Sequence, residues 1–499
     1  MCIRTLSGIK KRWEQKLPDE DRRWQITEPL AECDVPFTHR SGKATPHGDR
    51  QRRWSIPNRL LLIVSMALML IHSAFAQEKE VKRMKITLGP PVVVAQAQKP
   101  GLPWGVWQFP MIARTGKKEM AVFFSRSIDD SRAAAEQFVP PGCCVSRDGG
   151  RSWRPAPSPL GGGAFGYKPV CELRNGDRLC LLAPPSQDIP SKQLPPPAGF
   201  CDHGYGSSYS VRDPLRTSPE VMGRWQLARL RAGHRQWEYL PVTLKDPDAG
   251  IIGFDPAGKE FATIHWGESL HMRLLELPDG KLLDIRYGYR LNPDRKPRPK
   301  FEAWCLLSAD GGLSWKFHSI LGRDDQHANA GFTEPAACVL PDGTLLAALR
   351  TESGKPGALF LANSADGART WTKPRKVHPF GVLPQLLTLG SGVTVLALGR
   401  PGVHLLFSAD GSGESWQGYT TLVHEDGDEV DGLSGSGVGF QRGEKQEGRP
   451  KQSCTCGYTG LLATGPDRFL ISYSVFNHPN PAGRPRKTIM VREVVVSQE

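Results

Sequence analysis

Several widespread functional signatures are missing from this 499-residue sequence. It has no Cys-x-x-Cys pair, which argues against a zinc ribbon, and no HExxH, P-loop or GxSxG motif. The net charge is +13, but the chain has no run of five or more Lys or Arg residues and no basic helix, which argues against nucleic acid as a partner. The charge suits an acidic glycan, or a basic surface without a specific partner.

Long segments with helical periodicity are also missing, whereas glycine and proline are frequent. The chain contains 53 Gly and 43 Pro without a Gly-X-Y period, which excludes collagen. Hydrophobic residues make up 39% and charged residues 23%, which excludes a disordered chain. This composition predicts many short strands joined by turns.

The N-terminal part predicts a leader that does not belong to the fold. Residues 1–59 are polar without a clear period, and we interpret them as a mis-assigned start. Residues 60–76 form an apolar run that follows Arg59 and ends in Ala-Phe-Ala, which is typical of a secretory signal peptide. An uncleaved anchor is the alternative, although a membrane span usually needs about 20 apolar residues. We therefore expect a periplasmic, secreted or cell-surface protein without membrane contact beyond this segment.

Nine of the 11 cysteines follow the apolar run, and export permits disulfides. Cys171 and Cys180 flank Asn175-Gly176. If these two residues form a two-residue hairpin turn, the cysteines face each other across the strands. This spacing predicts a disulfide between Cys171 and Cys180.

A box of the form Ser-x-Asp-x-Gly-x-x-Trp occurs four times with small variations. Its Asp and Ser side chains can bond nearby backbone amides, Gly permits a positive φ, and Trp can cover the turn. We therefore interpret the boxes as structural turns and not as catalytic groups. The four copies span Ser146–Trp153, Ser308–Trp315, Ser364–Trp371 and Ser408–Trp416.

A second repeat consists of an apolar run, a turn and another apolar run, which predicts a hairpin. Six hairpins and four boxes predict an all-β fold over residues 101–499, a six-bladed β-propeller of four-stranded antiparallel blades. Residues 77–100 would be a linker and closing strand, with Val92–Val94 paired to Val494–Val496. A β-sandwich is the alternative, but it does not explain why box and hairpin recur together. The six hairpins are 110–122, 170–182, 274–283, 338–346, 386–396 and 461–471.

Boxes of this type in a six-bladed propeller resemble the sialidase (neuraminidase) superfamily, also called BNR-repeat or Asp-box proteins. The resemblance covers nearly all of the chain after the apolar run. It implies an exo-acting glycoside hydrolase that cleaves terminal sialic acid or a related acidic sugar from a sialoglycoconjugate, with retention and a tyrosine nucleophile. Non-enzymatic propellers carry the same boxes, so the function must be argued from the site.

Four residues match the positions of the family's functional groups. Glu334 and Arg350 bracket one hairpin, and Arg400 ends the next. The resemblance implies that Glu334 activates the nucleophile and that the two arginines bind the substrate carboxylate. Tyr458, at the start of the last hairpin, would be the nucleophile. The structural alternatives are surface charges for the first three residues and a packed side chain for Tyr458.

The first hairpin departs from the family pattern. The family has Phe/Tyr-Arg-x-Pro where this chain has Trp107-Gln108-Phe109-Pro110, so Gln108 stands in place of an arginine. Losing one of three charged contacts would cost about 2 kcal/mol of carboxylate binding. The acid/base is expected in the following loop, where Asp129 and Asp130 are candidates. The sequence does not choose between them; we favour Asp130 slightly, and solvated loop carboxylates are the alternative.

Other functions stay open at this point. The acidic stretch 425–432 could bind Ca²⁺, although its spacing is not that of an EF-hand and a solvated insertion is the alternative; no other cofactor is expected. The uncharged Gln108 favours a non-catalytic propeller that binds glycan or protein. A hydrolase or lyase for a different sugar is a third hypothesis. The enzymatic hypotheses require Gln108, Glu334, Arg350, Arg400 and Tyr458 to converge on one face of the propeller.

Overall fold

The computed structural model describes residues 84–129, 141–158, 170–184, 187–202, 208–255, 261–265, 274–325, 330–351, 357–423 and 454–498. The chain divides into units 1–79 and 80–499, and every described residue belongs to the second unit. The predicted leader and signal segment, Asp130 and the acidic stretch 425–432 therefore lie outside the described residues. Within the described part, no helix is long and apolar enough to cross a membrane.

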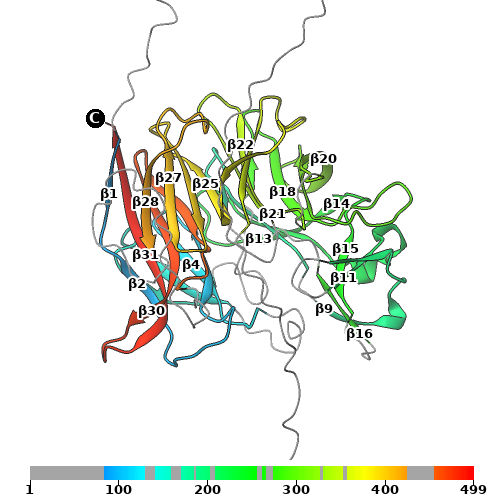
Figure 1. Ribbon diagram of the computed structural model, residues 1–499, viewed down its shortest axis with the longest axis horizontal. Helices are drawn as coiled ribbons and strands as arrows, with labels where there is room; N and C mark the ends of the chain where they lie inside the picture. Colours follow the sequence, from blue (N-terminus) through cyan, green and yellow to red (C-terminus); the bar gives the residue numbers. More distant parts are fainter. Residues whose placement is uncertain are drawn as a thin grey trace, which may run out of the picture. The chain divides into compact units, whose positions relative to one another are not determined.

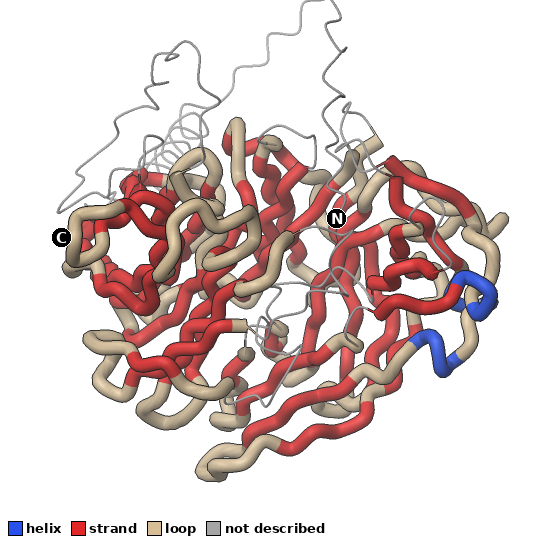
Figure 2. Tube along the Cα trace, turned by 90° about the horizontal axis from the view of Figure 1, so that it is seen from below, coloured by secondary structure: helices blue, strands red, loops and turns tan. Residues whose placement is uncertain are grey.

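The described chain is almost entirely β-structure, as the many strands in Figures 1 and 2 show, which confirms the predicted all-β class. Its helices are single turns, namely η1 (Ser191–Gln193), η2 (Pro214–Arg216) and α2 (Pro219–Met222).

The described strands form seven sheets, named here in chain order of the repeat hairpins. The first sheet contains β3 (Gln108–Arg114), β4 (Met120–Ser125), β5 (Gly142–Ser146) and β6 (Arg154–Pro155). The second contains β7 (Cys171–Glu172), β8 (Arg178–Leu182), β12 (Gln226–Leu230) and β13 (Glu238–Pro241). The third contains β17 (Leu275–Glu276), β18 (Leu282–Gly288), β19 (Glu302–Ser308) and β20 (Ser314–Gly322), with β14 (Thr243–Lys245) parallel to β20.

The fourth sheet contains β21 (Phe332–Val339), β22 (Leu345–Thr351), β23 (Leu359–Ser364) and β24 (Arg375–His378). The fifth contains β25 (Val382–Thr388), β26 (Thr394–Gly399), β27 (Val403–Ser408) and β28 (Gln417–Val423). The sixth contains β29 (Gly460–Gly465), β30 (Arg468–Pro479) and β31 (Pro485–Gln498), together with β1 (Met84–Leu88) and β2 (Val92–Gln96). The inserted sheet contains β9 (Gln187–Pro190), β10 (Gly199–Asp202), β11 (Ser208–Arg212), β15 (Ile251–Phe254) and β16 (Phe261–His265).

All six predicted hairpins are present, and each belongs to a different one of the six numbered sheets. They are the antiparallel pairs β3–β4, β7–β8, β17–β18, β21–β22, β25–β26 and β29–β30. The inserted sheet carries neither repeat and was not predicted; its strands come from the chain between β8 and β17. It has hydrophobic clusters of its own, partly shared with residues after β18.

The turn of the second-sheet hairpin has one more residue than predicted. The Leu173 N–H donates to the Asp177 carbonyl at 2.8 Å, and the Gly176 N–H donates to the Leu173 carbonyl at 2.8 Å. This is a three-residue loop whose last residue, Gly176, has φ +85°, a conformation that favours glycine. The turns at Leu277, Leu340 and Leu389 have the same pair of hydrogen bonds.

The predicted Cys171–Cys180 disulfide is wrong because of this loop. The extra loop residue shifts the register by one, so Cys171 lies opposite Leu179. A shift of one residue turns a side chain to the other face of the sheet. Cys171 and Cys180 accordingly belong to two different hydrophobic clusters, and no bond joins them.

The Asp boxes join the third and fourth strands of four sheets. In the third sheet, Asp310 accepts hydrogen bonds from the Ser308 hydroxyl (2.8 Å), and from the backbone N–H (2.9 Å) and hydroxyl (2.6 Å) of Ser314. The Trp315 indole N–H donates to the Gly312 carbonyl at 2.8 Å and closes the turn. Asp148, Asp366 and Asp410 also accept bonds from their own box serine. The interpretation of the boxes as structural turns is therefore confirmed.

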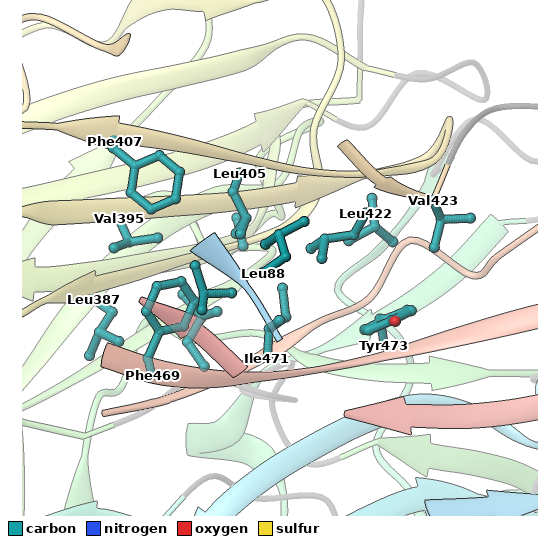
Figure 3. Close-up of a cluster of buried hydrophobic side chains, with 14 of the residues drawn as sticks. Leu88, Leu387, Val395, Leu405, Phe407, Leu422, Val423, Phe469, Ile471 and Tyr473 are labelled. Carbon is teal, nitrogen blue, oxygen red and sulfur yellow. The ribbon is translucent and has the colours of Figure 1, made fainter. Parts of the chain in front are cut away.

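Hydrophobic clusters lie between neighbouring sheets. Figure 3 shows the cluster between the fifth and sixth sheets, where Leu387 and Phe407 approach Phe469 and Leu88. Five more clusters join the first sheet to the second, the second to the third, the third to the fourth, the fourth to the fifth, and the sixth to the first. Each numbered sheet therefore has apolar neighbours on both faces.

Both N-terminal strands pair with the last strand, β31, which Figure 1 shows in red beside the blue β1 and β2. The N-terminal segment therefore does complete the last sheet, but the predicted residue pairing is wrong. Val92 lies opposite Val491, whereas Val494 lies opposite Leu88. The reason is that two strands share the length of β31, and β1 occupies the part expected for β2.

The box geometry predicts that replacing Asp310 destabilises the fold. Asp310→Ala removes the acceptor of two backbone N–H groups, so we expect the free energy of unfolding to fall by about 1 kcal/mol, as for a lost helix cap. Chemical denaturation measures this change. The control is Glu414→Ala, which removes only an exposed ion pair with Arg375 and should change stability by less than about 0.5 kcal/mol. Equal effects of the two changes would contradict the role of the box.

The same box predicts a pH dependence. Burial would raise the pKa of Asp310, but the hydrogen bonds from Ser314, Ser308 and Leu313 lower it from 3.8 to about 2. A carboxylate with a lowered pKa stabilises the fold above its unfolded pKa, and this contribution disappears as the pH falls through the folded pKa. The stability difference between wild type and Asp310→Ala should therefore shrink between pH 4 and pH 2. A constant difference would rule out this explanation.

Candidate functional site

Three of the predicted site residues are in direct contact. Glu334 in β21 accepts a hydrogen bond from the Tyr458 hydroxyl, just before β29, and forms an ion pair of 2.8 Å with Arg350 Nη1 in β22. The backbone N–H of Leu383 in β25 donates to Glu334 Oε2 at 2.8 Å. Only 6% of the Arg350 side chain and 8% of the Glu334 side chain are exposed. Residues from three sheets thus meet around one buried carboxylate.

The charges in this cluster fix its protonation state. Burial would raise the pKa of Glu334, but the Arg350 charge, with hydrogen bonds from Tyr458, Arg350 and Leu383, lowers it. Burial, followed by the charge of Glu334, raises the pKa of Tyr458 well above its usual value of 10. At neutral pH a neutral phenol therefore donates to an ionised carboxylate. This is the arrangement in which a general base activates a hydroxyl nucleophile.

The backbone around the cluster is strained. Of seven non-glycine residues with positive φ in the described chain, five lie here: Trp107, Phe109, Glu334, Leu383 and Arg400, with φ between 38° and 57°. Three of the five precede a proline in the first strand of a sheet, where the register shifts. Bulges of this kind re-aim side chains, and such strain, about 1–3 kcal/mol per residue, gathers at functional sites.

Arg400 lies beside the loop that carries Tyr458. Its Nη2 donates to the Cys456 carbonyl at 2.8 Å, and its guanidinium lies 4.8 Å from the centre of the Trp104 ring. The close approach requires glycine, because a Cβ on Gly399 would lie 2.1 Å from the carbonyl oxygen of Gly457. The second predicted arginine is therefore next to the cluster and bonded to the loop that carries Tyr458.

Phe109 in β3 contacts the cluster, and Gln108 precedes it in the same strand. The Phe109 ring lies 4.6 Å from the Tyr458 ring, and the Phe109 N–H donates to Cys456 Sγ at 3.4 Å. Gln108 is fully buried, and neither polar atom of its amide has a hydrogen-bond partner within the described part of the chain. An amide at this position offers a donor and an acceptor, but no charge.

Asp129 reaches the same neighbourhood through Trp104. The Trp104 indole N–H donates to Asp129 Oδ2 at 3.0 Å, and the Asp129 N–H donates to the Trp104 carbonyl at 3.1 Å. Asp129 is exposed, as an acid/base group that meets a substrate must be. Asp130, the other candidate, lies outside the described residues.

Sequence reasoning missed Trp104 and Cys456, which link these groups. Trp104 touches both Arg400 and Asp129, and Cys456 touches both Arg400 and Phe109. Their position in the sequence could have indicated them. Trp104 lies just before the stretch that contains Gln108, and Cys456 lies two residues before Tyr458. Among the described residues, no group of three or more His, Cys, Asp or Glu side chains could hold a metal ion.

Comparison with family models gives a match within this chain. Residues 263–464, less than half of the chain, match the model of the BNR repeat-like domain family. The match agrees with the predicted resemblance to BNR-repeat proteins. No match was found among curated protein sequences.

Solved structures with a similar fold include a protein of unknown function from Dyadobacter fermentans DSM 18053 (TM-score 0.52, 18% identity, 83% of this chain and 100% of that chain). Others are the Hadza microbial sialidase Hz136 (TM-score 0.43, 16% identity, 78% and 65%) and the Penicillium chrysogenum α-L-arabinanase (TM-score 0.44, 12% identity, 81% and 98%). The chain spans slightly less than two thirds of sialidase Hz136. Similarities at these identities concern the fold alone.

The buried ion pair predicts that Glu334→Gln destabilises the protein. Arg350 loses the carboxylate that neutralises it, and breaking a buried pair costs about 3–5 kcal/mol. Chemical denaturation at pH 7 measures the change. Glu119→Gln, which breaks an ion pair with the exposed Arg147, is the matched control and should cost less than about 1 kcal/mol. A loss at Glu334 no larger than at Glu119 would show that this pair is not a buried charge contact.

Proposed function

We propose that this protein is an exo-acting glycoside hydrolase that releases a terminal sialic acid or a related acidic sugar with retention. The observation that carries the proposal is the buried contact between the neutral hydroxyl of Tyr458 and the ionised carboxylate of Glu334, itself paired with Arg350. If Tyr458 had only a packing role, it would need neither the ionised carboxylate of Glu334 nor the buried charge of Arg350 beside it. These three residue types are those that the resemblance to sialidases implies.

In the proposed mechanism, the Tyr458 oxygen attacks the anomeric carbon while its proton moves to Glu334. The bond to the leaving group breaks, and its oxygen takes a proton from Asp129 or Asp130. The same aspartate then removes a proton from water, which attacks the tyrosyl-linked sugar. Glu334 returns the proton to Tyr458 as that bond breaks, so the anomeric configuration is retained.

The substrate charge is proposed from the two arginines. Arg350 and Arg400 would bind the carboxylate of the sugar, since guanidinium groups bind carboxylates in fixed geometry. Gln108 would supply a hydrogen bond where the family has a third cation, at a loss of about 2 kcal/mol of binding. Its amide is fully buried and has no hydrogen-bond partner among the described residues, so this bond would require a movement of the side chain.

The fold and the location of the protein complete the proposal. The six clusters between sheets can be followed from each numbered sheet to the next and back to the first, which supports a six-bladed propeller. We further propose that residues 60–76 direct export, which would bring the site to glycans outside the cytoplasm.

A second candidate is a non-catalytic propeller that binds an acidic glycan or a protein. Gln108 favours it, because it removes a charge that the catalytic family uses. A hydrolase or lyase for a different sugar is the third candidate, with Gln108 as the adaptation.

Hydrolysis of a fluorogenic α-sialoside tests the proposal. We expect turnover by the full chain and a loss of about 10³-fold in Tyr458→Phe, because the nucleophilic oxygen is removed. Tyr239→Phe, an exposed tyrosine on β13, is the control and should keep the wild-type rate. No turnover, together with calorimetric binding of sialic acid that Arg350→Met abolishes, would replace the hydrolase by the binding protein. If the protein shows no turnover of the sialoside and also no binding of sialic acid, the proposal of an acidic-sugar substrate is refuted.

A further inference from the structure

Trp104 is exposed although it contacts two residues of the candidate site. Its exposed fraction is 37%, which is high for a tryptophan. The Arg400 guanidinium lies over its ring, and its indole N–H donates to Asp129. The proposed mechanism uses both neighbours, but it gives the indole itself no role.

The indole is held firmly despite its exposure. Its ring meets the rings of Phe109 and Phe476 edge-on, at centroid distances of 6.2 and 6.1 Å. The backbone on either side is fixed by Lys487, whose Nζ donates to the carbonyls of Pro103 (2.8 Å) and Val106 (3.2 Å). An aromatic surface fixed in this way loses little entropy when a ligand binds to it.

The neighbours of Trp104 indicate which part of a substrate would meet it. The acidic sugar is proposed to lie against Arg400, and the oxygen of the scissile bond must lie within hydrogen-bond reach of the acid, which is Asp129 among the described residues. Trp104 bonds to Asp129, so the group on the far side of that oxygen would lie beside the indole. A pyranose ring presents a face of C–H groups, which packs well on an indole ring.

We propose that Trp104 is the platform for the leaving-group sugar, a neutral pyranose linked to the acidic sugar. This inference rests on the proposed function. It assigns the indole to specificity beyond the scissile bond, whereas Arg350 and Arg400 would recognise the acidic sugar itself. Phe109, Phe476 and Lys487 are then positioning residues that fix the platform.

Binding measured without turnover tests the platform. Calorimetry on the full chain with Tyr458→Phe would compare sialyllactose, sialic acid and lactose as ligands. We expect Trp104→Ala to weaken sialyllactose binding about tenfold and sialic acid binding less than about twofold, because Arg400 keeps its bond to the Cys456 carbonyl. Trp104→Phe should restore most of the affinity. Phe200→Ala, an exposed aromatic residue on the inserted sheet, is the control and should change neither affinity.

The outcomes separate this inference from the proposed function. An equal loss for sialyllactose and sialic acid would mean that Trp104 acts by holding Arg400, and would overturn the platform. Unchanged affinity for both would overturn it as well. If neither sialyllactose nor sialic acid binds the Tyr458→Phe protein, the acidic-sugar function fails. Lactose binding alone then tests the platform. Lactose binding that Trp104→Ala removes would sustain the platform, and the lack of any lactose binding would refute it.

Discussion

Packing of each sheet between two neighbours is the constraint on which the rest of the structure depends. A sheet with apolar neighbours on both faces cannot alternate polar and apolar side chains, and β4, β22 and β26 are buried along their whole length. The two arginines of the candidate site lie at the ends of strands, whereas the buried pair of Asp284 and Arg286 lies inside β18. Arg350, next to the last residue of β22, and Arg400, just after β26, lie where a strand leaves this packing. The candidate site therefore lies at strand ends, where side chains no longer pack between two neighbouring sheets.

Confining charge to strand ends does not remove the energetic cost of the site. Glu334 is a buried carboxylate, and it is held there by an arginine, a phenol and a backbone N–H from three different sheets. Its own backbone is strained, as are those of Phe109 and Leu383 at the equivalent bulges of two other sheets. Hydrophobic contacts between the sheets must supply the stability that keeps these conformations in place. A site assembled from several sheets is accordingly as rigid as the contacts between them.

The sequence predicted the features whose cause is local. A box or a hairpin is determined by hydrogen bonds within a few residues, so both could be found by repetition. Glu334 and Arg350 were identified through the family resemblance, because they bracket one hairpin as the family's residues do. The turn after Leu173 shows the limit, since two-residue and three-residue loops look alike in sequence and differ by one step of register. The inserted sheet carries no repeat. The contacts of Trp104 with Arg400 join distant parts of the chain, which no spacing encodes.

The pairing of β1 and β2 with β31 has a consequence for synthesis on the ribosome. These two strands are made early, yet their partner is residues 485–498, near the end of the chain. β31 also lies inside its sheet, between β1 and β30, so the sheet next to Tyr458 stays incomplete until residues 485–498 have been made. Closing such a long loop is slow compared with forming a hairpin. The nascent chain therefore carries two unpaired strand edges while the middle sheets assemble, and the candidate site is among the last parts of the molecule to form.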